Sequence, residues 1–196
     1  MKKINSVFIV LLVGLVLACQ SLPIEGDLGP KQFNLVDQNN TPRKFPEMIK
    51  GKIGIVGYIF TNCPDICPLT TNNMRLIQEE LKKENINDKV DFVSVSFDPE
   101  VDRPEVLKKF AEIRDLDLNN WTFLTGEKAI TDSLIKQVGV IAVVGDSSIT
   151  KDGEKIYYYV HTDRISLVDE EGNIRKNFLG SRAKIDEVVA DIKKLL

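Results

Sequence analysis

This sequence contains few histidines and cysteines, and it has no excess of positive charge. Its 196 residues include one histidine and three cysteines, and 29 Asp and Glu residues outnumber 26 Lys and Arg residues, for a net charge of −3. Because no basic patch stands out, we expect no nucleic-acid partner. The glycines at positions 51, 54 and 57 do not match the dinucleotide-binding fingerprint, and no helix is expected after them at the required point.

The N-terminal residues indicate export. A short basic start at Lys2 and Lys3 precedes an almost wholly apolar run from 4 to 17, which is short for a membrane-spanning helix and typical of a signal peptide. The end of this run, Val-Leu-Ala-Cys19, resembles the lipobox of bacterial lipoproteins. We therefore expect a signal peptide over 1–18, acylation of Cys19, a tether over 19–31 and a folded domain over 32–196. The domain would lie outside the cytoplasm, on the periplasmic side, anchored to the membrane through lipid.

Hydrophobic periodicity predicts an α/β domain that starts near Gln32. Short apolar runs predict strands, and apolar residues at spacings of three and four predict helices. The expected strands are 33–36, 53–60, 90–97, 121–124, 140–144, 156–161, 164–168 and 174–179. The expected helices are 68–84, 102–113, 130–138 and one starting at Ser181, and a polar loop is expected over 145–155. Asp102 and Glu105 would form a capping-box-like start of the second helix. Strands that alternate with helices imply a parallel core in the sheet.

Two cysteines lie where the first buried strand meets a helix. Pro68 favours Cys67 as the cap of a helix that begins at this proline. The turn from Cys63 to Cys67 then directs both sulfurs to one place, near helix-terminal amides that stabilise a thiolate. If Cys19 is acylated, Cys63 and Cys67 are the only two cysteines that keep a free thiol. From the residues alone, a metal site, a redox pair and a structural disulfide remain equally open.

The order of these elements resembles the thioredoxin fold. Four stretches are further similar to the Sco/SenC family of copper-binding cytochrome oxidase assembly proteins: Cys63–Pro68, Val95–Glu105, Phe123–Gly126 and Val160–Thr162. The resemblance implies a central mixed sheet flanked by helices, with an extra N-terminal strand region and a polar loop insertion before the histidine. It covers nearly all of the chain from residue 32 onward.

This resemblance implies a site and a function. Family members bind copper through two cysteines and a distant histidine, which correspond here to Cys63, Cys67 and His161. Such a donor set suits Cu(I) and also holds Cu(II). We expect a copper chaperone that supplies the dinuclear copper site of a cytochrome c oxidase subunit and is not an enzyme. Family members commonly have aspartate before the histidine, where this chain has valine, so Asp163 and Asp65 are the candidates for carboxylates that support the ligands.

The alternative function is a thiol-disulfide oxidoreductase that uses a redox disulfide between Cys63 and Cys67. Thioredoxin-like oxidoreductases place a cis-proline beside their cysteines from later in the chain. Pro104 is the last proline here, and residues 105–196 contain none. The usual substrate-clamping element is therefore missing from the sequence, which favours the chaperone.

Overall fold

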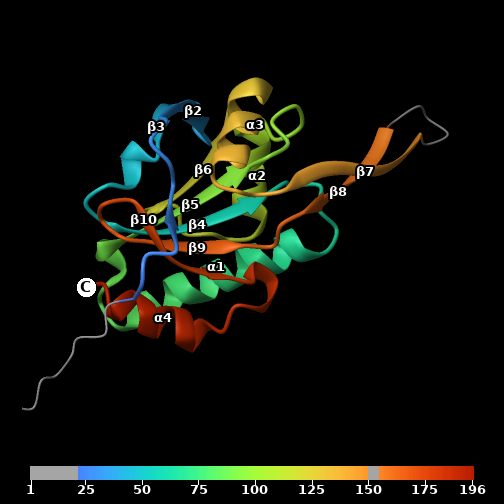
Figure 1. The fold of residues 1–196 in the computed structure, drawn as a ribbon. Helices are drawn as coiled ribbons and strands as arrows, with labels where there is room; N and C mark the ends of the chain where they lie inside the picture. The colour runs from blue at the N-terminus through green and yellow to red at the C-terminus, as the bar shows by residue number, and fades with distance from the viewer. Residues whose placement is uncertain (1–21, 150–154) are drawn as a thin grey trace, which may run out of the picture.

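An eight-stranded mixed sheet forms the centre of the molecule (Figure 1). The computed structural model describes residues 22–149 and 155–196. The strand order is β1-β10-β9-β4-β5-β6-β2-β3, with β4, β5 and β6 parallel and the flanking pairs antiparallel. The strands are β1 (Gly26–Asp27), β2 (Phe33–Asp37), β3 (Pro42–Phe45), β4 (Ile53–Ile59), β5 (Val90–Ser96), β6 (Trp121–Thr125), β9 (Ile165–Val168) and β10 (Asn173–Phe178). The predicted parallel core and mixed sheet are confirmed.

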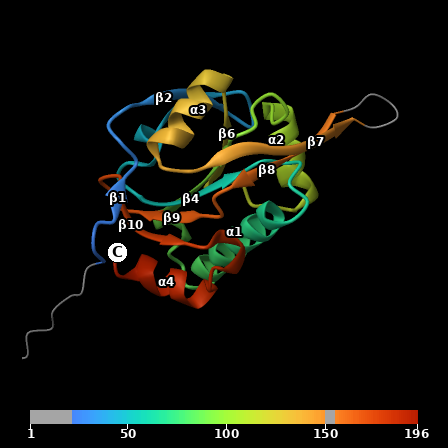
Figure 2. The same ribbon diagram turned by 45° about the vertical axis from the view of Figure 1, so that its right-hand side comes forward.

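Helices cover both sides of this sheet. They are α1 (Ile66–Lys83), α2 (Pro104–Ile113), α3 (Lys128–Gln137) and α4 (Ile185–Lys193), with short 3-10 turns η1 (Glu47–Ile49), η2 (Asn87–Lys89) and η3 (Gly180–Arg182). The helices α1 and α4 pack together below the sheet and α3 lies above it (Figures 1 and 2). All seven residues of β4 are consequently buried, as expected for a strand covered on both faces. A Cβ at Gly57 would lie 2.6 Å from Sδ of Met74, so this glycine lets α1 approach the strand.

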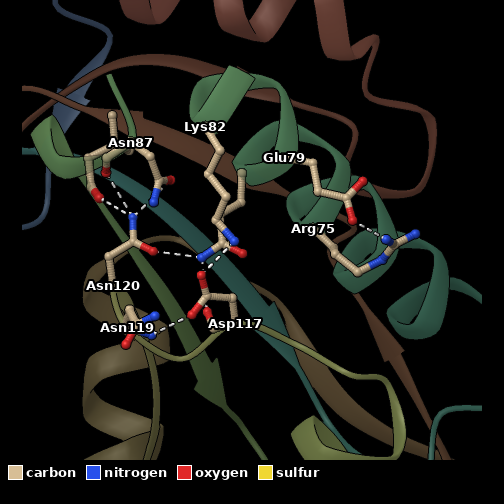
Figure 3. Close-up of polar contacts among 9 residues, drawn as sticks. Arg75, Glu79, Lys82, Asn87, Asp117, Asn119 and Asn120 are labelled. Atoms are coloured by element: carbon tan, nitrogen blue, oxygen red, sulfur yellow. Dashed lines mark hydrogen bonds and ion pairs between the residues drawn. The ribbon is translucent and has the colours of Figure 1, made fainter. Parts of the chain in front are cut away.

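Polar contacts fix the C-terminal half of α1 to the entrances of β5 and β6 (Figure 3). Lys82 pairs with the carboxylate of Asp117 at 2.5 Å. The buried amide of Gln78 donates to the carbonyl oxygen of Asp117 and to Asn120, and the Asn120 amide donates to the backbone oxygens of Asn87 and Val90. These bonds satisfy polar groups that burial would otherwise leave unpaired. They hold α1, whose first turn carries Cys67, in a fixed place on the sheet.

Two strands form a separate sheet that projects from the body (Figures 1 and 2). They are β7 (Ala142–Ile149) and β8 (Lys155–His161), paired so that Ala142 lies opposite His161. The predicted polar loop over 145–155 is wrong for its first part, because β7 continues to Ile149 after a shift in register. Backbone pairing in an exposed ribbon needs no apolar side chains, so the polar residues gave no strand signal.

The expected tether is wrong for its described part. Gly26 and Asp27 pair with β10, and the side chain of Leu28 is only 1% exposed. A two-residue edge strand and a single buried leucine leave no period in the sequence. The predicted signal peptide and Cys19 lie outside the described residues. None of the helices in the described part of the chain is long and apolar enough to cross a membrane.

The last helix also starts later than predicted. Ser181 lies in η3, and α4 begins at Ile185. The backbone N–H of Ser181 donates to the carboxylate of Asp163 at 3.0 Å, so this segment follows a side-chain partner that is distant in sequence. Such long-range capping has no local sequence signature.

Candidate metal centre

Three side chains that lie far apart in the sequence meet at one end of the parallel strands. Cys63 follows β4, Cys67 lies in the first turn of α1, and His161 ends β8. One ligand atom from each residue lies within 4.8 Å of the other two. The structure therefore brings together all three residues that the sequence singled out, although 94 positions separate Cys67 from His161.

The cysteine turn closes differently from the prediction. Helix α1 begins at Ile66 with Asp65 as its N-cap, so the expected cap at Cys67 is wrong. Pro68 is tolerated inside the first turn because the N–H groups there have no partner within the helix. The free N–H of Cys67 donates to Sγ of Cys63 at 3.4 Å, so the first sulfur takes part in capping the helix that carries the second.

The two thiols differ in acidity although they are neighbours. Both are free and buried, with 8% of Cys63 and 1% of Cys67 exposed. A hydrogen bond from the Cys67 thiol lowers the pKa of Cys63 to about 4, against the effect of burial and with further bonds from His161 and the Cys67 N–H. The same bond, followed by burial, raises the pKa of Cys67. At neutral pH the metal-free pair therefore consists of a Cys63 thiolate and a Cys67 thiol.

The imidazole of His161 presents one nitrogen to the sulfurs. Its Nε2 lies 3.6 Å from Sγ of Cys67, and its Nδ1 lies 3.1 Å from the carbonyl oxygen of Thr162. We assign the proton of the neutral ring to Nδ1 because this carbonyl oxygen can only accept. Burial lowers the pKa of His161, but the bonds to Cys63 and Thr162 outweigh it and raise the pKa overall. In the imidazolium, Nε2 also carries a proton and can donate to Cys63; in the neutral ring Nδ1 still donates to Thr162 and Nε2 is available as a ligand atom.

An aromatic frame surrounds the imidazole. The ring of His161 lies 4.9 Å from that of Phe97 and 5.8 Å from that of Phe60, between centroids. Tyr159 packs edge-on against both phenylalanines at 5.1 and 5.2 Å. Sequence reasoning missed this role for Phe60 and Phe97. The available signal was that each directly follows a buried strand, at the end where the cysteines lie.

Comparison with known proteins identifies the family. A model described as SCO1/SenC matches residues 24–196. The chain belongs to the SCO1/SenC family. A SCO1 protein homolog of Bacillus subtilis is 33% identical over 172 residues, which cover 87% of this chain and 83% of that protein.

Solved structures of the family share this fold. Bradyrhizobium japonicum ScoI with copper bound has a TM-score of 0.70 and 30% identity, over 85% of this chain and 98% of that one. A SCO1/SenC family lipoprotein of Bacillus anthracis has a TM-score of 0.71 and 31% identity, over 88% and 96%. BsSco, described as having a disulfide switch and as a member of the Sco family of cytochrome c oxidase assembly proteins, has a TM-score of 0.72 and 29% identity, over 90% and 98%. The predicted thioredoxin-like fold is confirmed.

The two candidate supporting carboxylates of this SCO1/SenC protein have separate places. Asp163 accepts hydrogen bonds from Thr70 in α1 and from Ser181 in η3, and it acts on His161 only through its charge, which helps to raise the pKa of the imidazole. A Cβ at Gly180 would lie 2.6 Å from Oδ1 of Asp163, so this packing requires glycine. Asp65 is exposed at the cap of α1 and is not in the group of three ligands.

The buried residues Asp98 and Asp102 do more than shape a turn. Asp98 is 1% exposed and accepts the hydroxyl groups of Tyr157 at 2.6 Å and Tyr159 at 3.4 Å. Asp102, predicted to cap the second helix, is fully buried and accepts from Thr61 and Ser96 instead. The capping-box prediction is therefore wrong, and Arg103 holds the cap position. Burial raises the pKa of Asp98 and raises that of Asp102 to about 6.

Proposed function

We propose that this protein is a copper chaperone that binds one copper ion through Cys63, Cys67 and His161. The observation that carries the proposal is the meeting of two sulfurs and one imidazole nitrogen within 4.8 Å. Two soft thiolates and an imidazole suit Cu(I), and the same set also holds Cu(II). The similarity to Bradyrhizobium japonicum ScoI, whose structure contains copper, supports copper as the bound ion.

The proposed recipient is the dinuclear copper site of a cytochrome c oxidase subunit. Support comes from the similarity to BsSco, which is described as belonging to a family of cytochrome c oxidase assembly proteins. Transfer proceeds by ligand exchange. An incoming thiolate forms a bond to the ion as the bond to Cys63 or Cys67 breaks, and the leaving thiolate takes up a proton. The oxidation state of copper does not change, and His161 holds the ion during the exchange.

The proposed location is outside the cytoplasm, on the periplasmic side, with attachment to a membrane through acylated Cys19. The lipobox-like sequence and the similarity to a Bacillus anthracis lipoprotein of the family support this anchor. A single acyl chain binds membranes only marginally, so stable attachment needs the several chains of a lipoprotein. Mass spectrometry of the native protein should detect this modification, and an unmodified Cys19 would contradict it.

A second candidate function is thiol-disulfide exchange. The observation that favours it is the acidic thiol of Cys63, since a low pKa makes a thiolate available for attack at neutral pH. The absence of proline from residues 105–196 counts against it, because no residue there can form the usual cis-proline clamp.

Copper titration of the reduced, metal-free protein tests the proposal. We expect one Cu(I) per chain, and we expect Cys63→Ser or Cys67→Ser to abolish tight binding because a single thiolate remains. Cys19→Ser is the matched control: it removes the third cysteine of the chain and should leave the stoichiometry at one. Unchanged Cu(I) affinity in Cys63→Ser or Cys67→Ser would overturn the chaperone proposal.

A further inference from the structure

The strand that carries His161 has two distinct faces. Side chains alternate along a strand, so Tyr157, Tyr159 and His161 share one face of β8, and Tyr158 and Val160 share the other. The second face is open to solvent, with 50% of Tyr158 and 68% of Val160 exposed. The first face meets the body of the protein through the rings of Phe60 and Phe97.

A buried carboxylate holds this first face. Both oxygens of Asp98 accept tyrosine hydroxyl groups, one from Tyr157 at 2.6 Å and one from Tyr159 at 3.4 Å. Asp98 itself is fixed, because its backbone N–H donates to Oγ of Ser96 and its carbonyl oxygen accepts from the N–H groups of Val101 and Asp102. Hydrogen bonds to a charged, buried acceptor are stronger than those between neutral groups.

The same turn also binds the loop that carries the cysteines. The hydroxyl of Ser96 donates to Asp102 at 2.6 Å, and Asp102 accepts the backbone N–H and the hydroxyl of Thr61. Thr61 lies two residues before Cys63. Residues 96–102 are therefore hydrogen-bonded both to the cysteine loop and to the histidine strand, and they set the separation of the two parts of the site.

We propose that Asp98, acting through Tyr157 and Tyr159, is a positioning residue that holds His161 beside the cysteines before the metal arrives. The inference rests on the proposed copper site. If the imidazole occupies its ligand position only part of the time, the apparent affinity falls by that fraction. The side chains of β7 are almost all exposed, so the contacts of the hairpin with the body come mainly from the first face of β8.

The first test uses metal-free protein and needs no copper. His161 is the only histidine, so the carbon-bound protons of its ring give a single set of NMR signals. The rings of Phe60 and Phe97 at 5.8 and 4.9 Å shift these signals in the parent protein. The double variant Tyr157→Phe/Tyr159→Phe keeps the aromatic rings at positions 157 and 159 and removes their hydroxyl groups. We expect its histidine signals to move toward the position of a free imidazole.

Tyr158→Phe is the matched control, because it removes a hydroxyl group from the intervening, exposed residue. It should leave the histidine signals in place. Asp98→Asn changes the acceptor of the two hydroxyl groups instead of the donors, and it should move the histidine signals in the same direction. Circular dichroism monitors the unfolding transition of the main sheet in each variant. An unchanged transition means that only the hairpin is released, and a weakened one means that the whole fold is damaged. Histidine signals that are the same in the double variant, in Asp98→Asn and in Tyr158→Phe would overturn the proposal.

The second test measures copper binding in the same variants. We expect Cu(II) affinity to fall about tenfold in the double variant, equivalent to ~1.4 kcal/mol, if the ligand position is occupied about a tenth of the time. Cu(I) affinity should change less, because two thiolates hold this ion by themselves. Equal losses for both ions would overturn the positioning role. A parent protein that binds no copper would refute the proposed function, while the NMR comparison would still decide whether Asp98 positions His161.

Discussion

The main sheet and the projecting β7–β8 hairpin contribute unequal parts to one site. The main sheet supplies two cysteines from a buried strand end and a helix held by several polar contacts. The hairpin supplies one histidine from a ribbon whose first strand is almost entirely exposed. The stability of the fold therefore resides in the first region, whereas the geometry of the third ligand depends on the second.

The largest expected difference between the two regions is in stability. Ile55 in β4 is fully buried, whereas Ile149 in β7 is 76% exposed. Ile55→Ala should lower the free energy of unfolding by about 2–5 kcal/mol, the usual range for such a deletion in a core. The identical change Ile149→Ala should stay within about 0.5 kcal/mol, as for an ordinary surface substitution. Urea denaturation measures both, and similar losses would show that the hairpin unfolds as part of the core.

Stability should also depend on pH through Asp102, a buried residue on the main-sheet side. Burial raises its pKa to about 6 in the folded protein, above the ordinary value of 3.8. Its contribution to stability is therefore full below pH 4 and is lost as pH rises through 6, because the unfolded chain releases the proton first. The loss is on the order of 3 kcal/mol for a shift of about two pKa units.

Asp102→Asn isolates this effect from the other carboxylates. The amide cannot ionise, so the difference in unfolding free energy between variant and parent should move in favour of the variant between pH 4 and pH 7. Asp102 is linked to Asp98 through Ser96, so the histidine NMR signals serve as an internal check that β8 stays in place in the variant. A difference that is constant over this pH range would contradict the predicted pKa.

The same contrast explains what the sequence predicted well. Strand 53–60 is a continuous run without charged residues, and strand 90–97 is rich in valine and phenylalanine; both patterns indicate a buried strand. The helix after the cysteines has an apolar residue at every turn, at Met74, Ile77 and Leu81. The elements on which the two cysteines lie were therefore predictable from local patterns, with an error of two residues at the start of α1.

The features that the sequence did not predict depend on contacts between distant residues. Asp98 and Asp102 looked like turn and cap residues, because nothing local shows that Tyr157 and Thr61 will reach them. Leu28 and the two-residue strand β1 join the fold in a segment too short to show a hydrophobic period. The position of His161 followed only from family resemblance, since a lone histidine after a strand is usually an ordinary, partly buried residue. These are cases in which tertiary partners override local preference.

His161 is the single proposed ligand that the hairpin supplies. His161→Ala should weaken Cu(II) binding more than Cu(I) binding, because the cysteines of the main sheet hold Cu(I) without help and Cu(II) also favours nitrogen donors. Competition titrations with both ions on one preparation measure the two losses. Equal losses would mean that the hairpin supports the whole site and would remove the distinction between the two regions.

The smallest effect is expected in the metal-free form of this His161→Ala variant. The imidazole is a smaller cause of the lowered pKa of Cys63 than the bond from Cys67, so the reduction potential of the Cys63/Cys67 pair should shift by less than about 30 mV, equivalent to ~1.4 kcal/mol. If disulfide exchange is the function, the bond from His161 that helps to lower the pKa of Cys63 is needed for activity. Loss of that bond would then slow exchange with a small disulfide. Intact binding of both copper ions together with a large loss of exchange rate would overturn the chaperone assignment in favour of an oxidoreductase.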